Sequence, residues 1–374
     1  MALIFCDGFD TALTQNNIGI WDSVQVGADA TLDYSTTYAR TDSGANGKSL
    51  KMTGSATTKN TWIKKGLGST YTDLYIGFAF LYDNDTYVLA ASDDTGGHVP
   101  LLKLIASNGK PQIVVAINDQ SLTLQTLRYD NSGPETFGNY TVLGSGSTAL
   151  AVKTWYYIEL HVIISDTVGE TTVRINGTQD INVTGADTNN AGSDIATIQL
   201  FEEGRSDQGQ AGEIYIDDVI VHDTTTAVSN SWPDNAGCVT LFPNADGTYT
   251  QWTSTAGAVD YTEVDDADSG DPDSTTTMLS DSTATQKTTV NLEPLSAAAT
   301  IGGVQLCSYA SNDVSGSSTV KDMTIVNASD YKNTAWTPST SWEYHLTPLT
   351  VSPDTSIAWT KTEVDAMELG WETQ

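Results

Sequence analysis

The segment "WYYIELHVII" (155–164) is followed, after a short polar connection, by "TTVRINGTQD" (171–180), and these two segments decide the fold. Both are rich in aromatic and β-branched residues, which favour strands over helices. Asn176-Gly177 lies inside the second segment and is the strongest short-range signal for a β-hairpin turn. The sequence therefore predicts consecutive antiparallel strands joined by a tight turn.

The same strand-and-turn pattern continues along the rest of the chain. Apolar residues make up 39% and charged residues 17% of the 374-residue sequence, and Thr, Ser, Gly, Asn and Asp are abundant. Long periodic runs of helix-forming residues are almost absent, so we predict an all-β protein. Further strands are expected at 73–82, 101–106, 111–118, 196–203 and 213–223.

The length of the chain suits two domains. The segment "TTTAVSNSWPDNAG" (224–237) is small, polar and contains one proline, which is typical of a linker. We predict a β-sandwich of the jelly-roll type over residues 1–224, a linker over 225–237 and a second β-sandwich module over 238–374.

One segment near the C-terminus, "WTKTEVDAMELGWE" (359–372), has helical spacing instead. Thr360 and Glu363 form a capping-box pattern, in which the first residue caps the helix and the third helical residue reaches back. Gly370 follows as a natural stop. The pattern predicts one short helix of about two turns.

The chain carries 47 acidic and 16 basic residues, for a formal net charge of −31. Such a charge repels phosphate backbones and anionic lipids, so we expect no nucleic-acid partner and no membrane insertion. The N-terminal "MALIFCDGFD" reads as a first strand rather than a signal peptide. Cys6, Cys238 and Cys307 are too few and too scattered for a disulfide framework. We expect a soluble protein made in a reducing cytosol.

The most acidic stretch is "YTEVDDADSGDPDS" (261–274). Calcium favours oxygen-rich turns of this kind, but the EF-hand spacing and its closing glutamate are missing. Two interpretations stay open: weak calcium binding by Asp266, Asp268, Asp271 and Asp273, or a solvated connection between two strands. Apart from this calcium, no cofactor is expected.

Paired carboxylates for glycoside hydrolysis are hard to find. Glu213 and Asp217 in "EIYIDD" fall on one face of a strand but roughly 13 Å apart, too far for a retaining pair. The adjacent Asp217 and Asp218 point to opposite faces unless a bulge intervenes. We interpret these aspartates as acceptors of backbone N–H groups.

Histidines and tryptophans give the remaining candidates. His98, His161, His222 and His345 are isolated in sequence, and no nucleophile-elbow motif accompanies them. Aromatic faces on a β-sandwich can stack on sugar rings. Trp252, Trp336 and Trp342 are the candidates for such stacking, with packing in a core or a subunit interface as the alternative.

Four segments together carry a family resemblance: "LIFCDGFD", "WYYIELHVIISD", "TVRINGTQD" and "GEIYIDDVIVHD". Over most of residues 1–224 the chain resembles the concanavalin A-like (laminin-G-type) jelly-roll domains of tailed-bacteriophage virion proteins. Residues 238–372 resemble a module that often follows them, through "VTLFPNADGTYTQWT", the acidic stretch, "VQLCSYASND" and "AWTKTEVDAMELGWE".

This resemblance implies a non-enzymatic virion structural protein, assembled in the host cytoplasm together with other virion proteins. A tail-fibre or baseplate-associated component with host-glycan contact is the main expectation, and a capsid decoration protein is an alternative. A homo-oligomer, plausibly a trimer, is the usual arrangement for such appendages. A carbohydrate-binding module and a glycoside hydrolase are the further alternatives. No catalytic set carries over from the resemblance.

Overall fold

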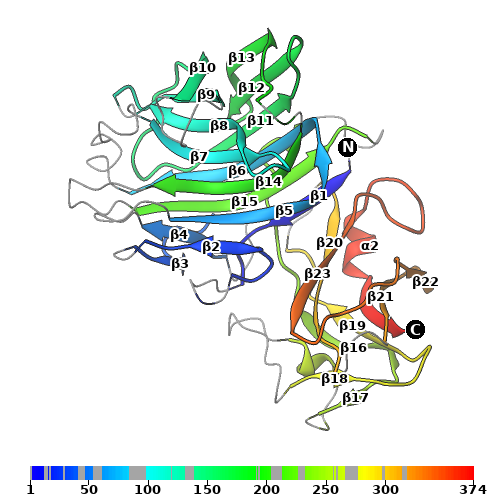
Figure 1. Ribbon diagram of the computed structural model, residues 1–374. Coiled ribbons are helices and arrows are strands. Elements are labelled where there is room, and N and C mark those ends of the chain that lie inside the picture. The colour runs from blue at the N-terminus through cyan, green and yellow to red at the C-terminus, as the bar shows by residue number, and fades with distance from the viewer. Residues whose placement is uncertain are drawn as a thin grey trace. The chain divides into compact units, whose positions relative to one another are not determined.

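The computed structural model describes residues 2–11, 16, 18–27, 30–40, 47–53, 61–83, 98–118, 120–130, 139–190, 192, 194–203, 213–225, 232–255, 257, 260–265, 277–296, 300–313 and 318–374. The fold is all-β, as predicted (Figure 1). Contacts divide the chain into two compact units. The N-terminal unit comprises Leu3–Thr226 with Asn230–Cys238, and the C-terminal unit comprises Val239–Gln374.

The N-terminal unit is a sandwich of two antiparallel sheets. Its strands are β1 (Leu3–Asp7), β2 (Ser23–Gln25), β3 (Leu32–Ser35), β4 (Ser49–Thr53), β5 (Thr61–Tyr71), β6 (Asp73–Tyr82), β7 (His98–Ile105), β8 (Pro111–Asn118), β9 (Leu124–Tyr129), β10 (Tyr140–Ser145), β11 (Tyr156–Ile163), β12 (Gly169–Ile175), β13 (Thr178–Ala186), β14 (Ile195–Glu203) and β15 (Glu213–Asp223). One sheet has eight strands in the order β13-β12-β11-β6-β15-β4-β3, with β1 also paired to β15. The other has seven strands in the order β10-β9-β8-β7-β14-β5-β2.

The hairpin predicted from sequence is confirmed. Strands β12 and β13 pair in antiparallel register, and Asn176 and Gly177 connect them with φ angles of 50° and 75°. Positive φ at both central residues is the mark of the type I′ turn, whose twist matches that of the flanking strands.

The two sheets face each other across a well-packed apolar core. The Oγ1 atoms of Thr126 on β9 and Thr171 on β12 lie 3.0 Å apart, so these side chains point into the sandwich. From β6, Phe78 and Phe80 are both 0% exposed. Burying one such ring contributes about 1.5–3 kcal/mol, and side chains of this kind make the sandwich stable.

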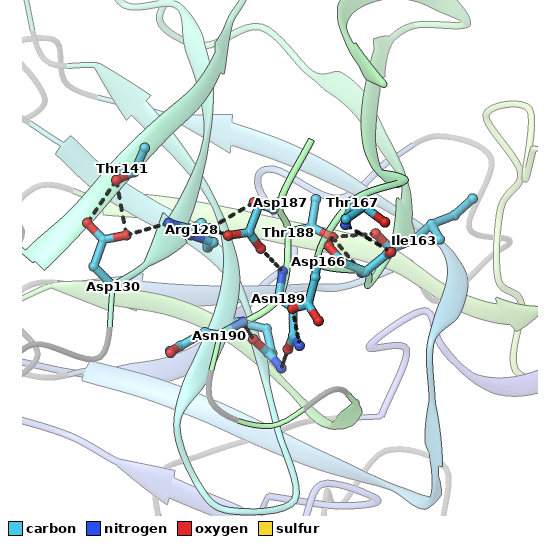
Figure 2. A network of polar contacts seen from close by, with 12 residues as sticks. Arg128, Asp130, Thr141, Ile163, Asp166, Thr167, Asp187, Thr188, Asn189 and Asn190 are labelled. Atoms are coloured by element: carbon cyan, nitrogen blue, oxygen red, sulfur yellow. Dashed lines mark hydrogen bonds and ion pairs between the residues drawn. The ribbon is translucent and has the colours of Figure 1, made fainter. Parts of the chain in front are cut away.

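A polar network holds the segment that crosses from one sheet to the other (Figure 2). Arg128 on β9 contacts Asp130 and Asp187, and the Nδ2 of Asn189 donates to Asp166 at 2.8 Å. Thr188 donates to the carbonyl oxygen of Ile163 at 2.7 Å. These bonds satisfy the polar groups where β13 leads into β14, and they position β14 in the seven-stranded sheet.

The C-terminal unit also consists of antiparallel sheets. Its elements are β16 (Pro243–Thr250), β17 (Thr253–Ser254), the 3₁₀ helix η3 (Asp260–Glu263), β18 (Leu279–Ser280), β19 (Lys287–Leu292), β20 (Val304–Ala310), β21 (Val320–Val326), β22 (Ser329–Lys332), β23 (Glu343–Leu349), α2 (Lys361–Asp365) and β24 (Glu368–Thr373). A five-stranded sheet in the order β16-β19-β24-β21-β22 accompanies the pairs β20-β23 and β17-β18.

The predicted helix is present but shorter than expected. Thr360 caps α2, and both bonds of the capping box with Glu363 are formed. The prediction that the helix continues to Gly370 is wrong, because Glu368–Thr373 forms β24 between β19 and β21. Hydrogen bonds to two neighbouring strands outweigh the local helical spacing here. Among the described residues, no helix has the length and apolar character needed to cross a bilayer.

Candidate functional site

The outer face of the seven-stranded sheet, the face turned away from the core, carries the candidate site. We distinguish the inner from the outer face of this sheet by Thr126, whose side chain points into the core and which is paired with Val115 on β8. Val115 pairs with Leu102, Leu102 with Leu200, and Leu200 with Ile63, so these side chains also point inward. Because side chains alternate along a strand, the neighbouring row points outward.

This outward row crosses three strands with polar side chains. Lys64 on β5 stands opposite Gln199 on β14, and Gln199 stands opposite Lys103 on β7. Neighbouring strands are about 4.8 Å apart, so the backbones of the two lysines lie roughly 10 Å apart with the glutamine between them. We call Lys64, Gln199 and Lys103 the Lys–Gln–Lys row.

The row is enclosed rather than freely solvated. Lys103 is 4% exposed and Gln199 is 3% exposed, although both lie on the outer face. The Nζ of Lys64 lies 4.1 Å from the centre of the Trp62 ring, a cation–π contact from the same strand. Two ammonium groups, an amide and an indole therefore share one small area of a strongly acidic protein.

The row continues into an apolar patch on the same face. Val114 stands opposite Lys103 and Leu127 stands opposite Val114. Val114, Ala116 and Leu127 are each at most 1% exposed and pack together with Tyr140. On this face Lys103 is therefore followed by buried apolar side chains, which pack among themselves.

The opposite, eight-stranded sheet carries buried carboxylates on a β-bulge. The register between β15 and β6 shifts between Asp217 and Ile220, and Asp218 has a φ of 51°. Asp217 accepts from the backbone N–H groups of Arg40 and Asp218, and Asp218 accepts from the N–H of Cys238 at 2.6 Å. The interpretation of these aspartates as backbone acceptors is confirmed.

Charge and burial around this bulge favour a structural role. The guanidinium of Arg40 lies 2.6 Å from Asp218, and both side chains are almost fully buried. Burial, together with the neighbouring Asp218 charge, raises the pKa of Asp217. Glu213 is engaged by Lys51 at 2.7 Å and by the hydroxyl of Tyr215 at 2.6 Å. These buried charged side chains connect neighbouring strands of the eight-stranded sheet and fix the segment that ends at Cys238.

His161 also belongs to a satisfied cluster. Its Nε2 lies 2.9 Å from Asp73 and its Nδ1 lies 3.2 Å from Glu170. Burial lowers the pKa of His161, but the two carboxylates outweigh this and the net shift is upward. The ring stacks on Tyr75 at 4.1 Å, and Trp232 packs edge-on against Tyr75 at 5.2 Å. These contacts hold the segment around Trp232 against the sheet.

The three tryptophans predicted for sugar stacking are all partly buried against aromatic partners. Trp252 lies 6.4 Å from Trp371 and donates to the carbonyl oxygen of Gln286. Trp342 stacks on Tyr309 at 5.3 Å. Trp336 stacks on His345 at 4.1 Å and lines a pocket. Sugar stacking by these residues stays a prediction.

The predicted calcium ligands Asp266, Asp268, Asp271 and Asp273 lie outside the described residues. Within the part of the chain that the structure describes, no group of three or more His, Cys, Asp or Glu side chains could hold a metal ion.

Comparisons with known proteins return similarities of architecture. No protein-family model and no curated protein matches the chain. Among solved structures, an endo-β-1,4-glucuronan lyase from the fungus Trichoderma reesei has a TM-score of 0.42 at 14% identity, over 56% of this chain and 94% of the lyase. An alginate lyase from Chlorella virus has a TM-score of 0.35 at 9% identity, over 54% and 99%. A carbohydrate-binding module from Bacillus subtilis has a TM-score of 0.30 at 10% identity, over 51% and 95%.

These findings correct two predictions. The structures named above are polysaccharide lyases and a carbohydrate-binding module, which contradicts the prediction of a non-enzymatic virion structural protein. The prediction that the chain is not an enzyme is contradicted by the lyases. The reason is physical: strand spacing and turn residues specify a jelly roll, whatever particle or pathway uses it. The prediction of a β-sandwich fold is supported by the two antiparallel sheets of the N-terminal unit, whereas a phage origin is not supported.

The Lys–Gln–Lys row was missed in the sequence. Its signal was a charged or amide side chain in the middle of an apolar strand, Lys103 in "LLKLIA" and Gln199 in "ATIQLFEE". A buried polar residue in such a position must be hydrogen-bonded, because burial without a partner is costly, and the Nε2 of Gln199 donates to the carbonyl oxygen of Phe201 at 3.3 Å.

Proposed function

We propose that the N-terminal unit binds an acidic polysaccharide on the outer face of its seven-stranded sheet. The observation that carries this proposal is the Lys–Gln–Lys row, in which half-buried Lys64 offers its ammonium group beside the Trp62 ring while the buried Gln199 and Lys103 lie behind it on the two adjacent strands. Lysines donate charge-assisted hydrogen bonds to carboxylates, and the amide of glutamine can donate to and accept from hydroxyl groups.

The net charge of −31 does not prevent this binding. At physiological ionic strength the Debye length is about 8 Å, so an exposed carboxylate on the far side of the unit is largely screened from the row. Charges at the row itself are screened much less because Lys103 is almost fully buried. Local charge therefore decides which glycans bind.

The test compares acidic and neutral glycans in calorimetric titrations. Wild-type protein should bind oligoglucuronate or oligomannuronate and not a neutral cello-oligosaccharide. A hydrogen bond to a charged group contributes about 1.5–3 kcal/mol, so Lys64→Gln should weaken binding about tenfold or more. Lys51→Gln is the matched control, since Lys51 lies on β4 of the opposite sheet and pairs with Glu213. Equal affinity for the neutral glycan, or an equal loss in both variants, would contradict the proposal.

Cleavage of the bound chain is a second candidate, favoured by the burial of Lys103 at 4% exposure beside Gln199. In β-elimination a base removes the proton next to a uronate carboxylate, while a hydrogen-bond donor stabilises the developing negative charge on that carboxylate. A carbon–carbon double bond forms as the glycosidic C–O bond at the β carbon breaks, and the departing oxygen takes a proton from the protonated base or from water. In this second candidate Lys103 acts as a neutral amine base rather than as an ammonium group, and the amide of Gln199 donates to the carboxylate. Formation of unsaturated uronate, followed by its ultraviolet absorbance, is the assay. Lys103→Gln should abolish it, and the absence of product from every uronate chain that binds would exclude cleavage.

A further inference from the structure

The C-terminal unit contains a pocket of its own, independent of the function proposed above. It has a volume of about 250 Å³ and is lined by residues 333–336 and by the β23 segment that begins at His345. Sites for drug-sized ligands measure roughly 300–1,000 Å³, so this pocket accommodates one small ring rather than a polymer.

A buried carboxylate orients the imidazole in this pocket. Asp322 on β21 is 0% exposed and lies 2.8 Å from the Nδ1 of His345. It also accepts hydrogen bonds from Thr347 at 2.6 Å and from Ser308 at 2.8 Å. Burial raises the pKa of Asp322, but its hydrogen bonds to His345, Thr347 and Ser308 outweigh burial and lower it overall.

The ionised carboxylate fixes which ring nitrogen faces a ligand. A carboxylate only accepts, so the Nδ1 of His345 carries a proton and Nε2 is left for other partners. Among the described residues, Nε2 makes no hydrogen bond. The His345 ring lines the pocket, and Asp322 fixes the orientation of this ring through Nδ1.

The second polar atom comes from Trp336. Its ring stacks on the His345 ring, with centroids 4.1 Å apart and planes within 9°. The indole Nε1 is buried and has no hydrogen-bond partner among the residues that the structure describes. A buried indole N–H without a partner is uncommon, since this group normally finds an acceptor. Trp336 lines the pocket, so this donor without a partner lies next to the space that a ligand would occupy.

We propose that this pocket binds a single neutral sugar unit through two of its hydroxyl groups. The indole N–H of Trp336 donates to one hydroxyl, and the Nε2 of His345 accepts from the same or the adjacent one. A hydroxyl group suits this pair because it donates and accepts at once. An anionic ligand is disfavoured by the buried charge of Asp322 close behind the imidazole.

The test uses methyl α-glucopyranoside, methyl α-mannopyranoside and glucuronate as probes on the full chain. Proton–nitrogen correlation spectra follow the ring nitrogens of His345, and saturation-transfer spectra follow the sugars. At least one neutral glycoside should shift the Nε2 resonance saturably and more strongly than glucuronate does. If none of them shifts it, or if glucuronate binds more tightly with the same shift, the proposal is overturned. This part needs no variant.

Two matched variants locate the site. Trp336→Phe keeps an aromatic ring over His345 but removes the N–H, and it should weaken glycoside binding at least fivefold. Trp342→Phe is the control, because Trp342 stacks on Tyr309 and is not part of the pocket lining. It should leave the affinity unchanged. Equal affinities for Trp336→Phe and wild type, with His345 Nδ1 unshifted, would overturn the assignment of the indole as a donor.

Discussion

Replacing Asp322 by asparagine tests how the C-terminal unit is held together. The carboxylate is fully buried and accepts from His345, Thr347 and Ser308, at 2.8, 2.6 and 2.8 Å. Asn is almost the same size, but its NH₂ group faces hydrogen-bond donors instead of accepting from them. Leaving a buried hydrogen-bonding group without its partner costs about 1–3 kcal/mol. We expect Asp322→Asn to lose free energy of unfolding in that range.

The same carboxylate gives a pH dependence with a definite sign. The pKa of Asp322 is lowered in the folded protein from the ordinary value of 3.8. A lowered pKa stabilises the folded state at pH values above the unfolded pKa, and this contribution is lost as pH falls through the folded pKa. Wild type should therefore lose stability below about pH 4 more steeply than Asp322→Asn.

Urea unfolding of the full chain at several pH values measures both effects, with each unit's transition resolved separately. Asp354→Asn is the control: Asp354 is exposed and is bonded by Tyr331 and by Asn327 at 2.7 Å. The Asp354→Asn substitution should barely change the free energy of unfolding. If Asp322→Asn cost less than about 1 kcal/mol, the order of one ordinary hydrogen bond, the carboxylate would not be the organising group described above.

Three further predictions concern the N-terminal unit. In Gly77→Ala, the added Cβ would lie 2.5 Å from the hydroxyl oxygen of Tyr157, so the free energy of unfolding should fall by about 1–3 kcal/mol. Adding Tyr157→Phe should restore part of this loss, and no recovery would mean that the clash lies elsewhere. Asp73→Asn should lower the pKa of His161 in an NMR titration, and an unchanged titration would contradict the ion pair. In wild type the protonated His161 stabilises the folded state below pH 6.5, and this contribution is lost as pH rises through the raised pKa; the variant should show a smaller contribution. The thiol of Cys238 is buried and its hydrogen bond with a neighbouring thiol raises its pKa, so a thiol reagent should modify it only after unfolding; rapid labelling of the native protein would contradict this.

The parts of the fold that sequence predicts well are those with local causes. The hairpin at Asn176-Gly177 requires two residues that tolerate positive φ, and both φ angles are positive. The capping box of Thr360 and Glu363 is likewise formed within one turn of chain. Glu368–Thr373 was wrongly predicted because its strand hydrogen bonds come from β19 and β21, which no local pattern specifies.

The bulge at Asp217 shows a different limit. Strict alternation places two adjacent aspartates on opposite faces, and the sequence "IDD" contains no glycine to signal an irregularity. In the structure Asp218 itself takes a φ of 51°, which an aspartate tolerates better than most residues. The conformation is held by Arg40 and by the N–H of Cys238, which are distant in sequence. A bulge of this kind is decided by tertiary contacts.

The two candidate sites were hidden for the same reason, although each left a trace. Periodicity assigns Lys103 and Gln199 to strands, but only the strand order places β14 between β5 and β7 and so aligns them with Lys64. Trp336 was one of three equivalent tryptophans in the sequence, and what distinguishes it is its contact with the His345 ring, which Asp322 on β21 holds in place. In both places a polar atom lies where packing alone would favour an apolar one. The indole Nε1 of Trp336, which has no hydrogen-bond partner among the described residues, marks a position where a ligand supplies a hydrogen bond that the fold does not.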